Sequence, residues 1–232
     1  MKQYKNLTII GTSHIAIESV NEVENAIFTM LPDIITLELD HARYHALLRK
    51  KRRLPTISDI LNMGFKGFIF NLIGSIAENK LGKIVGVKPG SEMKKAIYAS
   101  KKTGGRIFLI DQDIRVTLKN ISNRITWKEK FEFLKDVLNG IVFRKKAYID
   151  FDLEKVPSEK VIRKLTAHLK KKYPSLYLSL IEDRNKYMAK NLYKLMTINP
   201  KKRILAIVGA GHENEIVNLI KEIEKNVEVY SY

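Results

Sequence analysis

Short apolar runs rich in β-branched residues alternate along this chain with longer stretches in which apolar residues recur at helical spacing. This alternation constrains the fold strongly, because it is typical of an α/β protein with one mixed, largely parallel sheet flanked by helices. That fold class is therefore the one we expect. The runs predicted to form strands span residues 7–11, 34–39, 106–110, 176–181, 204–209 and 227–230, with a less regular candidate at 83–87.

The stretches between these runs are predicted to be helices, because their apolar residues recur every three to four positions and several follow a capping residue. They span residues 19–31, 41–52, 91–102, 127–138, 158–172, 183–196 and 213–225. No linker rich in glycine, proline or serine separates them, so residues 1–232 are expected to form one domain with a sizeable core. The stretch 51–82 is predicted to be a helical insert between strands.

The composition excludes some classes of site and leaves several partners open. The chain contains no cysteine, which excludes a disulfide scaffold, a cysteine-ligated zinc site and a thiol nucleophile. The net charge of +17 is compatible with nucleic acid, an anionic membrane surface or an acidic substrate. Apart from the run at 49–53 and smaller clusters, the basic residues are widely spread, which favours a solvated lysine-rich surface. No nucleic-acid-binding motif is present, so no specific nucleic acid partner is predicted.

No stretch of the sequence has the length expected of a membrane span. The first fourteen residues lack the long apolar segment of a signal peptide. The most apolar window, at 64–77, is shorter than the roughly 18 residues that a span requires, and it contains Lys66. We expect a cytoplasmic protein or the soluble domain of a membrane-associated one. Association with a membrane surface and with a second copy of the chain are both left open.

Ionisable residues follow the ends of five predicted strands. In an open parallel sheet the carboxyl ends of the strands lie along one edge, and ligands bind there. The sequence therefore predicts a polar site at one rim of the sheet, built from two imidazoles, several carboxylates and two guanidiniums. In chain order, the residues at these strand ends are His14, Glu38, Asp40, Arg43, Asp111, Asp113, Glu182, Asp183, Arg184 and His212.

Two of the strand ends carry the same short motif, Gly-x-x-His, which ends at His14 and at His212. In each, an apolar run leads to a glycine, two small residues and the histidine, and a helical pattern follows. We expect the glycine to permit a tight turn out of the strand and the histidine to act as a metal ligand or proton carrier. The alternative is a plain turn or cap residue. The other histidines, His41, His45 and His168, are expected at the surface or its boundary.

The charged candidates also have structural alternatives. Glu38 lies in an apolar run, where an unpaired carboxylate would be costly, so it is expected to meet a cation. Arg43, close by in the following helix, is a natural partner for a structural ion pair. Asp111 and Asp113 could cap a helix, and Glu182 could begin one, where its charge suits the helix dipole.

The order of the motifs resembles the TraB/PrgY pheromone-shutdown family, which is related to the GumN and Tiki proteins. The resemblance runs from residue 7 to residue 216, through GTSH and PDIITLELDHARYHAL, VKPGSEMKKAI, LIDQDIRVTLKN, IEDRNKYMAKNL and IVGAGHENEI. It implies a mixed α/β fold shared with erythromycin esterases and ChaN-like proteins. It also implies metal-dependent peptidase chemistry by analogy with Tiki, while other members are described as limiting a peptide pheromone by binding or degradation.

The site residues that this resemblance implies are His14, Glu38, Arg43, Glu92, Asp113, Glu182, Arg184 and His212. Gln112 departs from the pattern, because the family usually has arginine between the two aspartates. Many relatives also continue into C-terminal transmembrane helices.

From the residues and the resemblance together, we predict hydrolysis of a peptide or of a related amide or ester. His14 and His212, with Glu38 or Glu182, would hold one divalent metal such as Mn²⁺ or Co²⁺. The other carboxylate would act as general base, and Arg43 or Arg184 would stabilise the oxyanion. A metal-free reaction with a histidine as base would use the same residues. The alternatives are non-catalytic binding of a peptide or small anion in the same cleft, and binding of nucleic acid or an anionic membrane through the basic surface.

Overall fold

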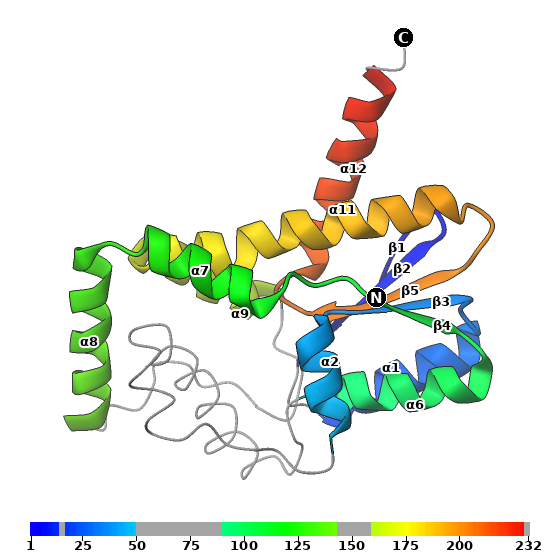
Figure 1. Cartoon of the computed structure of the whole chain (residues 1–232), viewed down its shortest axis with the longest axis horizontal. Coiled ribbons are helices and arrows are strands. Elements are labelled where there is room, and N and C mark those ends of the chain that lie inside the picture. Colours follow the sequence, from blue (N-terminus) through cyan, green and yellow to red (C-terminus); the bar gives the residue numbers. More distant parts are fainter. Residues whose placement is uncertain (14–16, 50–89, 143–158, 230–232) are drawn as a thin grey trace.

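The computed structural model describes residues 1–13, 17–49, 90–142 and 159–229 (Figure 1). Within these ranges the chain forms a five-stranded sheet with the strand order β1-β2-β5-β3-β4. Only β1 runs antiparallel to its neighbour, and the other pairs are parallel. The predicted mixed, largely parallel sheet is therefore confirmed. The strands are β1 (Lys2–Tyr4), β2 (Leu7–Thr12), β3 (Ile34–Leu37), β4 (Arg106–Leu109) and β5 (Ile204–Gly209).

Helices cover both faces of the sheet. The described helices are α1 (Ile17–Met30), α2 (His41–Leu48), α6 (Ser91–Thr103), α7 (Ile114–Arg124), α8 (Trp127–Val142), α9 (Glu159–Lys172), α10 (Pro174–Tyr177), α11 (Asp183–Ile198) and α12 (Glu213–Val229). A π-helical segment, η2 (Leu178–Glu182), joins α10 to α11. Of these, the sequence did not predict α7 or α10 as helices.

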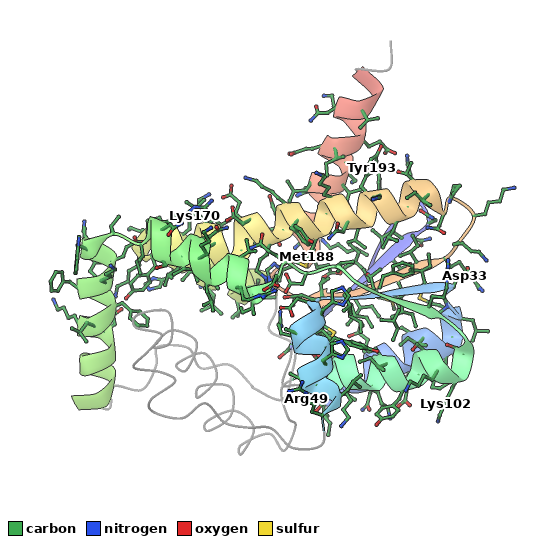
Figure 2. The ribbon with its side chains drawn as sticks, in the orientation of Figure 1. Asp33, Arg49, Lys102, Lys170, Met188 and Tyr193 are labelled. Atoms are coloured by element: carbon green, nitrogen blue, oxygen red, sulfur yellow. The ribbon has the colours of Figure 1, made fainter. Side chains whose placement is uncertain are left out.

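Side chains alternate between the two faces of the central strands. Ile204, Ala206 and Val208 of β5 pack against α11 and α12, whereas Leu205 and Ile207 pack against α1 and α6. Figure 1 accordingly shows α11 on one side of the sheet and α1 and α6 on the other, and Figure 2 labels Met188, a core residue of α11. Burial on both faces explains why the strands read as nearly continuous apolar runs.

Two predicted strands are wrong. Residues 176–181 alternate leucine with other residues, which is a strand pattern, yet they form α10 and η2. The buried residues of this segment are Ser175, Leu176 and Ser179. Two of these three are serines, so the buried side of the helix does not appear as apolar residues at helical spacing. The predicted strand at 227–230 is the last turn of α12 up to Val229. The short edge strand β1 was missed because it is mostly exposed and carries no apolar run.

Some predictions fall on residues that the structure does not describe. They are the strand at 83–87, the helical insert at 51–82, most of the basic run at 49–53, and His14. The assignment of residues 1–232 to a single domain stays a prediction. In the part of the chain that the structure describes, no helix is long and apolar enough to cross a membrane.

A buried carboxylate holds the start of α8 against the body of the molecule. The Glu129 carboxylate accepts hydrogen bonds from the Thr126 backbone N–H at 3.0 Å and from the Ser175 backbone N–H at 2.8 Å. The Glu129 N–H in turn donates to the Thr126 hydroxyl at 3.2 Å, which completes a capping box. Burial alone would raise the pKa of Glu129, but these hydrogen bonds lower it below its ordinary value.

We expect Glu129→Gln to weaken the fold by about 0.5–2 kcal/mol near neutral pH, because it removes a charged cap. A carboxylate with a lowered folded pKa contributes stability above its unfolded pKa of 4.5, and this stability is lost as the pH falls through the folded value. The wild type should therefore lose more free energy of unfolding than the variant between neutral pH and about pH 3. Urea unfolding at both pH values measures this, with Glu132→Gln on the same helix as control. Equal pH dependence of the Glu129 variant and the wild type would contradict the assignment.

Candidate functional site

The two Gly-x-x-His segments lie on neighbouring strands. The parallel register of β2 and β5 places Thr12 opposite Gly209. The Ala210 N–H donates to the Thr12 carbonyl at 2.8 Å, so the pairing continues into the second motif. The structure thus brings residues 11–13 of the first motif beside the second motif at the carboxyl edge of the sheet. It places His212 there, whereas His14 lies outside the described residues.

The connections that leave these two strands go to opposite faces of the sheet. The helix that follows β2 is α1, which packs on one face, and the helix that follows β5 is α12, which packs on the other. Such a change of face between neighbouring strands is a topological switch point, the position where open α/β sheets bind ligands. The fold therefore places both motifs at a position suited to a functional site.

Gly11 is needed for close packing rather than for a turn. It lies inside β2, and it is not among the described residues with positive φ. A β-carbon at this position would lie 2.8 Å from Oε2 of Glu213 and 3.1 Å from the Cα of Ala210. The predicted tight turn at Gly11 is therefore wrong. The glycine lets the first turn of α12 approach β2, because no side chain stands between them.

Glu38 is the buried carboxylate at the end of β3, with a residue exposure of 2%. Its Oε1 accepts from Nη2 of Arg184, and its Oε2 accepts from the Gly209 backbone N–H at 2.5 Å. The sequence suggested Arg43 as its partner, but the described partner is Arg184, 146 residues along the chain. Glu38 thus joins the end of β3 to helix α11 and to the second Gly-x-x-His motif.

His212 faces the same carboxylate. Its Nε2 lies 3.5 Å from Oε1 of Glu38, and its Nδ1 lies 2.5 Å from Oδ1 of Asn185. All three residues are buried. Because an amide oxygen can only accept, the contact with Asn185 places the proton of a neutral imidazole on Nδ1 and leaves the lone pair on Nε2.

Asp111 lies between two guanidiniums. Nε and Nη2 of Arg184 donate to its two oxygens at 2.9 and 2.7 Å, and Nη1 of Arg43 donates to Oδ2 at 2.7 Å. The Asp111 side chain is fully buried, whereas the Arg43 side chain keeps 38% exposure. Arg43 therefore reaches from the buried network to the solvent. We call the connected set the Glu38 cluster: Glu38, Arg43, Asp111, Arg184, Asn185 and His212.

Arg184 lies in the first turn of α11, just after the π-helical segment, not at a strand end as predicted. Its Nη1 donates to the Leu180 carbonyl of that segment at 3.1 Å. Short π-helical segments occur often at functional sites. Burial alone would lower the pKa of Arg184, but the charges of Glu38 and Asp111 outweigh it and raise the pKa above its usual value. The guanidinium is therefore a fixed positive charge in the cluster.

Two neighbouring aspartates, Asp40 and Asp113, cap helices. For Asp113, this is the structural alternative that the sequence left open. Asp40 accepts from the Arg43 N–H at 2.8 Å and from the Ile114 N–H at 3.2 Å, so it joins the first turns of α2 and α7. Asp113 caps α7 and pairs with the exposed side chain of Arg115. Hydrogen bonds from Arg115 lower the pKa of Asp113 to about 2.

Two other candidates are not members of the connected set named above. Glu182 is partly exposed, and its Oε1 accepts from the Lys186 ammonium at 2.7 Å, one helical turn away. Glu92 is fully buried in the first turn of α6, on the face of the sheet opposite α11. In the described part of the chain, no group of three or more His, Cys, Asp or Glu side chains could by itself hold a metal ion.

Sequence reasoning missed three groups at this site. Asn185 orients His212, Gly209 donates its N–H to Glu38, and Glu213 covers Gly11. The only signal for them was position, since Asn185 follows Arg184 and Glu213 follows His212 directly. Asn185 and Glu213 could have been found as polar residues next to a charged candidate. Gly209 could not, because it acts through its backbone N–H, which every residue except proline has.

The protein is therefore of the α/β class, with a buried carboxylate, imidazole and guanidinium at the switch point of its sheet. The sequence profile of the TraB/PrgY/gumN family matches residues 2–228. The chain is also 35% identical over 227 residues to an uncharacterized protein of Methanocaldococcus jannaschii, covering 97% of this chain and 55% of that one. It is 21% identical over 242 residues to the TraB domain-containing proteins of Mus musculus and Homo sapiens, covering 94% of this chain and 61% of each.

This chain belongs to the TraB/PrgY/gumN family. The resemblance predicted from the ordered motifs is thereby confirmed. The chain spans between half and two thirds of the length of these relatives.

We expect Gly11→Ala to lower the free energy of unfolding by about 1–3 kcal/mol, because the new methyl group overpacks the contact between β2 and α12. Replacing Glu213 with alanine in the same chain should recover part of this loss, since it removes the nearest clashing atoms. The four free energies of unfolding form a double-mutant cycle. A coupling free energy of zero would show that Glu213 and Gly11 do not constrain each other.

Asp111→Asn should lower the free energy of unfolding by about 3 kcal/mol, because Arg184 then loses one of its two buried anionic partners. Glu182→Gln breaks the exposed ion pair with Lys186 and should cost less than about 1 kcal/mol. Denaturant unfolding of both variants tests this. Similar values for the two would mean that the buried network contributes no more than a surface pair.

Proposed function

We propose that this chain hydrolyses a peptide, or a related amide or ester, at the Glu38 cluster, with the help of one divalent metal ion. The observation that carries the proposal is the contact between Nε2 of His212 and Oε1 of Glu38, 3.5 Å apart and buried at the carboxyl ends of β5 and β3. Family membership supports the choice of site, because both residues stand in the motifs that carry the resemblance.

The contact brings two electron-rich atoms face to face. With its proton on Nδ1, His212 directs the lone pair of Nε2 towards a carboxylate oxygen. Two acceptors at this distance repel each other unless a proton or a cation lies between them. Since both are removed from bulk water, solvent screens that repulsion poorly. The pair therefore favours a bound cation or a protonated imidazole.

The chemistry of these two donors fits a divalent metal. Nε2 of His212 and Oε1 of Glu38 are both atom types that bind divalent metals, and they face each other 3.5 Å apart. His212 and Glu38 would be two of its ligands, and His14 is the third one we propose. Mn²⁺ or Co²⁺ suits such a set of imidazole and carboxylate ligands. When bound, such an ion lowers the pKa of a coordinated water and polarises a carbonyl group.

The other members of the cluster prepare this site for the reaction. Asn185 fixes the ring orientation and the tautomer of His212, as partners behind metal-binding histidines commonly do. Arg184 and the Gly209 N–H stabilise Glu38 as an anion, which suits a ligand better than a proton acceptor. Arg43, half-exposed at the edge of the cluster, is placed to stabilise an oxyanion. Glu182 stays the proposed general base.

A second candidate function is binding without turnover, in which the same site sequesters a peptide or a small anion. The observation that favours it is the closed ion network. Both oxygens of Glu38 and both of Asp111 already accept hydrogen bonds, while Arg43 alone extends to the solvent. Such an arrangement can hold an anionic group at Arg43 with no reaction following.

The test compares metal content, peptide binding and peptide-library cleavage, with and without added Mn²⁺ or Co²⁺. The wild type is compared with Glu38→Gln, Arg43→Ala, Glu182→Gln, Asn185→Ala and His212→Ala. We expect the wild type to retain metal and to cleave. Loss of Asn185 should lower cleavage or metal affinity about 10–100-fold, and loss of Glu38 or His212 should lower them at least as much. His168→Ala, an exposed histidine of α9, is the matched control.

Each outcome has a distinct meaning. Cleavage that Glu182→Gln abolishes while metal content stays normal supports Glu182 as the base. Peptide binding that needs Arg43, without cleavage under any metal condition, supports the second candidate. Absence of bound metal together with cleavage that does not depend on His212 overturns the metal-dependent hydrolase.

A further inference from the structure

Helix α8 presents its large apolar side chains to the solvent. Trp127, Phe131 and Leu134 are 73%, 67% and 50% exposed. Their spacing of four and three residues places them on one side of the helix. We call these three residues the α8 stripe. Figure 1 shows α8 at one end of the molecule, away from the sheet, so the stripe lies apart from the Glu38 cluster.

The opposite side of α8 is anchored by polar contacts. The Glu129 carboxylate holds the Thr126 and Ser175 N–H groups, as described above. About two turns later, Oδ2 of Asp136 accepts from the Tyr173 hydroxyl at 2.5 Å and from the Lys172 ammonium. These contacts fix which side of the helix faces the body. The stripe faces outward because the acidic side is the one that is bound.

The charges beside the stripe are basic. Lys128 and Lys135 are exposed along one edge of it, and Lys130 stands along the other edge, with its Nζ 4.3 Å from the centre of the Trp127 ring. Among the acidic residues of α8, Glu129 is buried and Asp136 is bound by Lys172 and Tyr173, so neither offsets these lysines. Glu132 lies farther round the helix, where its charge acts on Tyr173. An apolar side with tryptophan and phenylalanine, flanked by lysines, is the pattern of a helix that lies in an anionic lipid interface.

We propose that the α8 stripe inserts into the surface of an anionic lipid bilayer, with Lys128, Lys130 and Lys135 against the phosphate groups. The charge pattern decides between this and a second copy of the chain. A two-fold interface built on the stripe would set lysines against lysines, which repel, and a lipid headgroup layer supplies the opposite charge. The proposal is independent of the function proposed for the Glu38 cluster.

Trp127 is the only tryptophan of the chain, so its fluorescence reports on the stripe directly. We expect its emission to move to shorter wavelength when vesicles of phosphatidylcholine and phosphatidylglycerol are added to the full chain. Vesicles of phosphatidylcholine alone should give a smaller shift. Raising the salt to about 1 M should weaken binding, because the Debye length falls to about 3 Å. Co-sedimentation with the vesicles measures the same partition independently.

Variants separate insertion from general charge attraction. Phe131→Ser should abolish the shift, and each of Lys128→Ala and Lys135→Ala should weaken the partition about fivefold. Lys102→Ala is the matched lysine control, since Lys102 lies on α6, away from α8 (Figure 2), and Tyr98→Ser is the control for an exposed aromatic residue. Both controls should bind as the wild type does. Unchanged unfolding curves exclude loss of the fold in any variant.

Several results would overturn the proposal. One is no shift with anionic vesicles, and another is binding that Lys102→Ala weakens as much as Lys128→Ala does. A dimer in solution whose Trp127 emission is already at short wavelength without lipid would assign the stripe to a second copy. A shift produced by a DNA or RNA oligomer but not by vesicles would assign it to nucleic acid.

Discussion

The guanidinium of Arg184 is the point on which the described site depends. It binds Glu38 at the end of β3, Asp111 just after β4, and the Leu180 carbonyl in the π-helical segment. Removing a guanidinium from water costs several kcal/mol unless its donors are satisfied. The two strand ends and the helix must therefore hold their relative positions together, since a shift of any one leaves a buried charge unpaired. Glu38 extends the same constraint to β5 through the Gly209 N–H.

This constraint explains why the network suits a site better than a plain structural support. A buried ion network is often no more stabilising than apolar side chains of the same volume, so stability alone gives little reason to build one. What the network does provide is orientation. It holds one oxygen of Glu38 towards Nε2 of His212, while Asn185 holds the ring from its other nitrogen. Groups fixed in this way need little rearrangement when a ligand or a cation arrives.

The sequence predicted well which residues lie at the rim of the sheet, and it predicted poorly which of them form ion pairs with each other. Strand periodicity located β2, β3, β4 and β5 closely, and the strand-end rule brought Glu38, Asp111 and His212 to one edge. It assigned Arg43 to Glu38 because they are close in the chain, whereas Arg43 binds Asp111. Arg184 was placed at a strand end and comes from a helix. Long-range pairing depends on how α11 packs across the sheet, which periodicity within one segment does not contain.

Helix α8 is a second case in which periodicity predicted the element but not its orientation. Its capping box, Thr126 with Glu129, is legible in the sequence, and the helix itself was predicted. An apolar side at helical spacing ordinarily predicts the core-facing side, yet here Trp127 is exposed and Glu129 is buried. Leaving large apolar side chains in water forgoes about 1.5–3 kcal/mol each, so the orientation has to be held by the contacts of Glu129 and Asp136. The outward apolar side of α8 is explained if a lipid layer covers it.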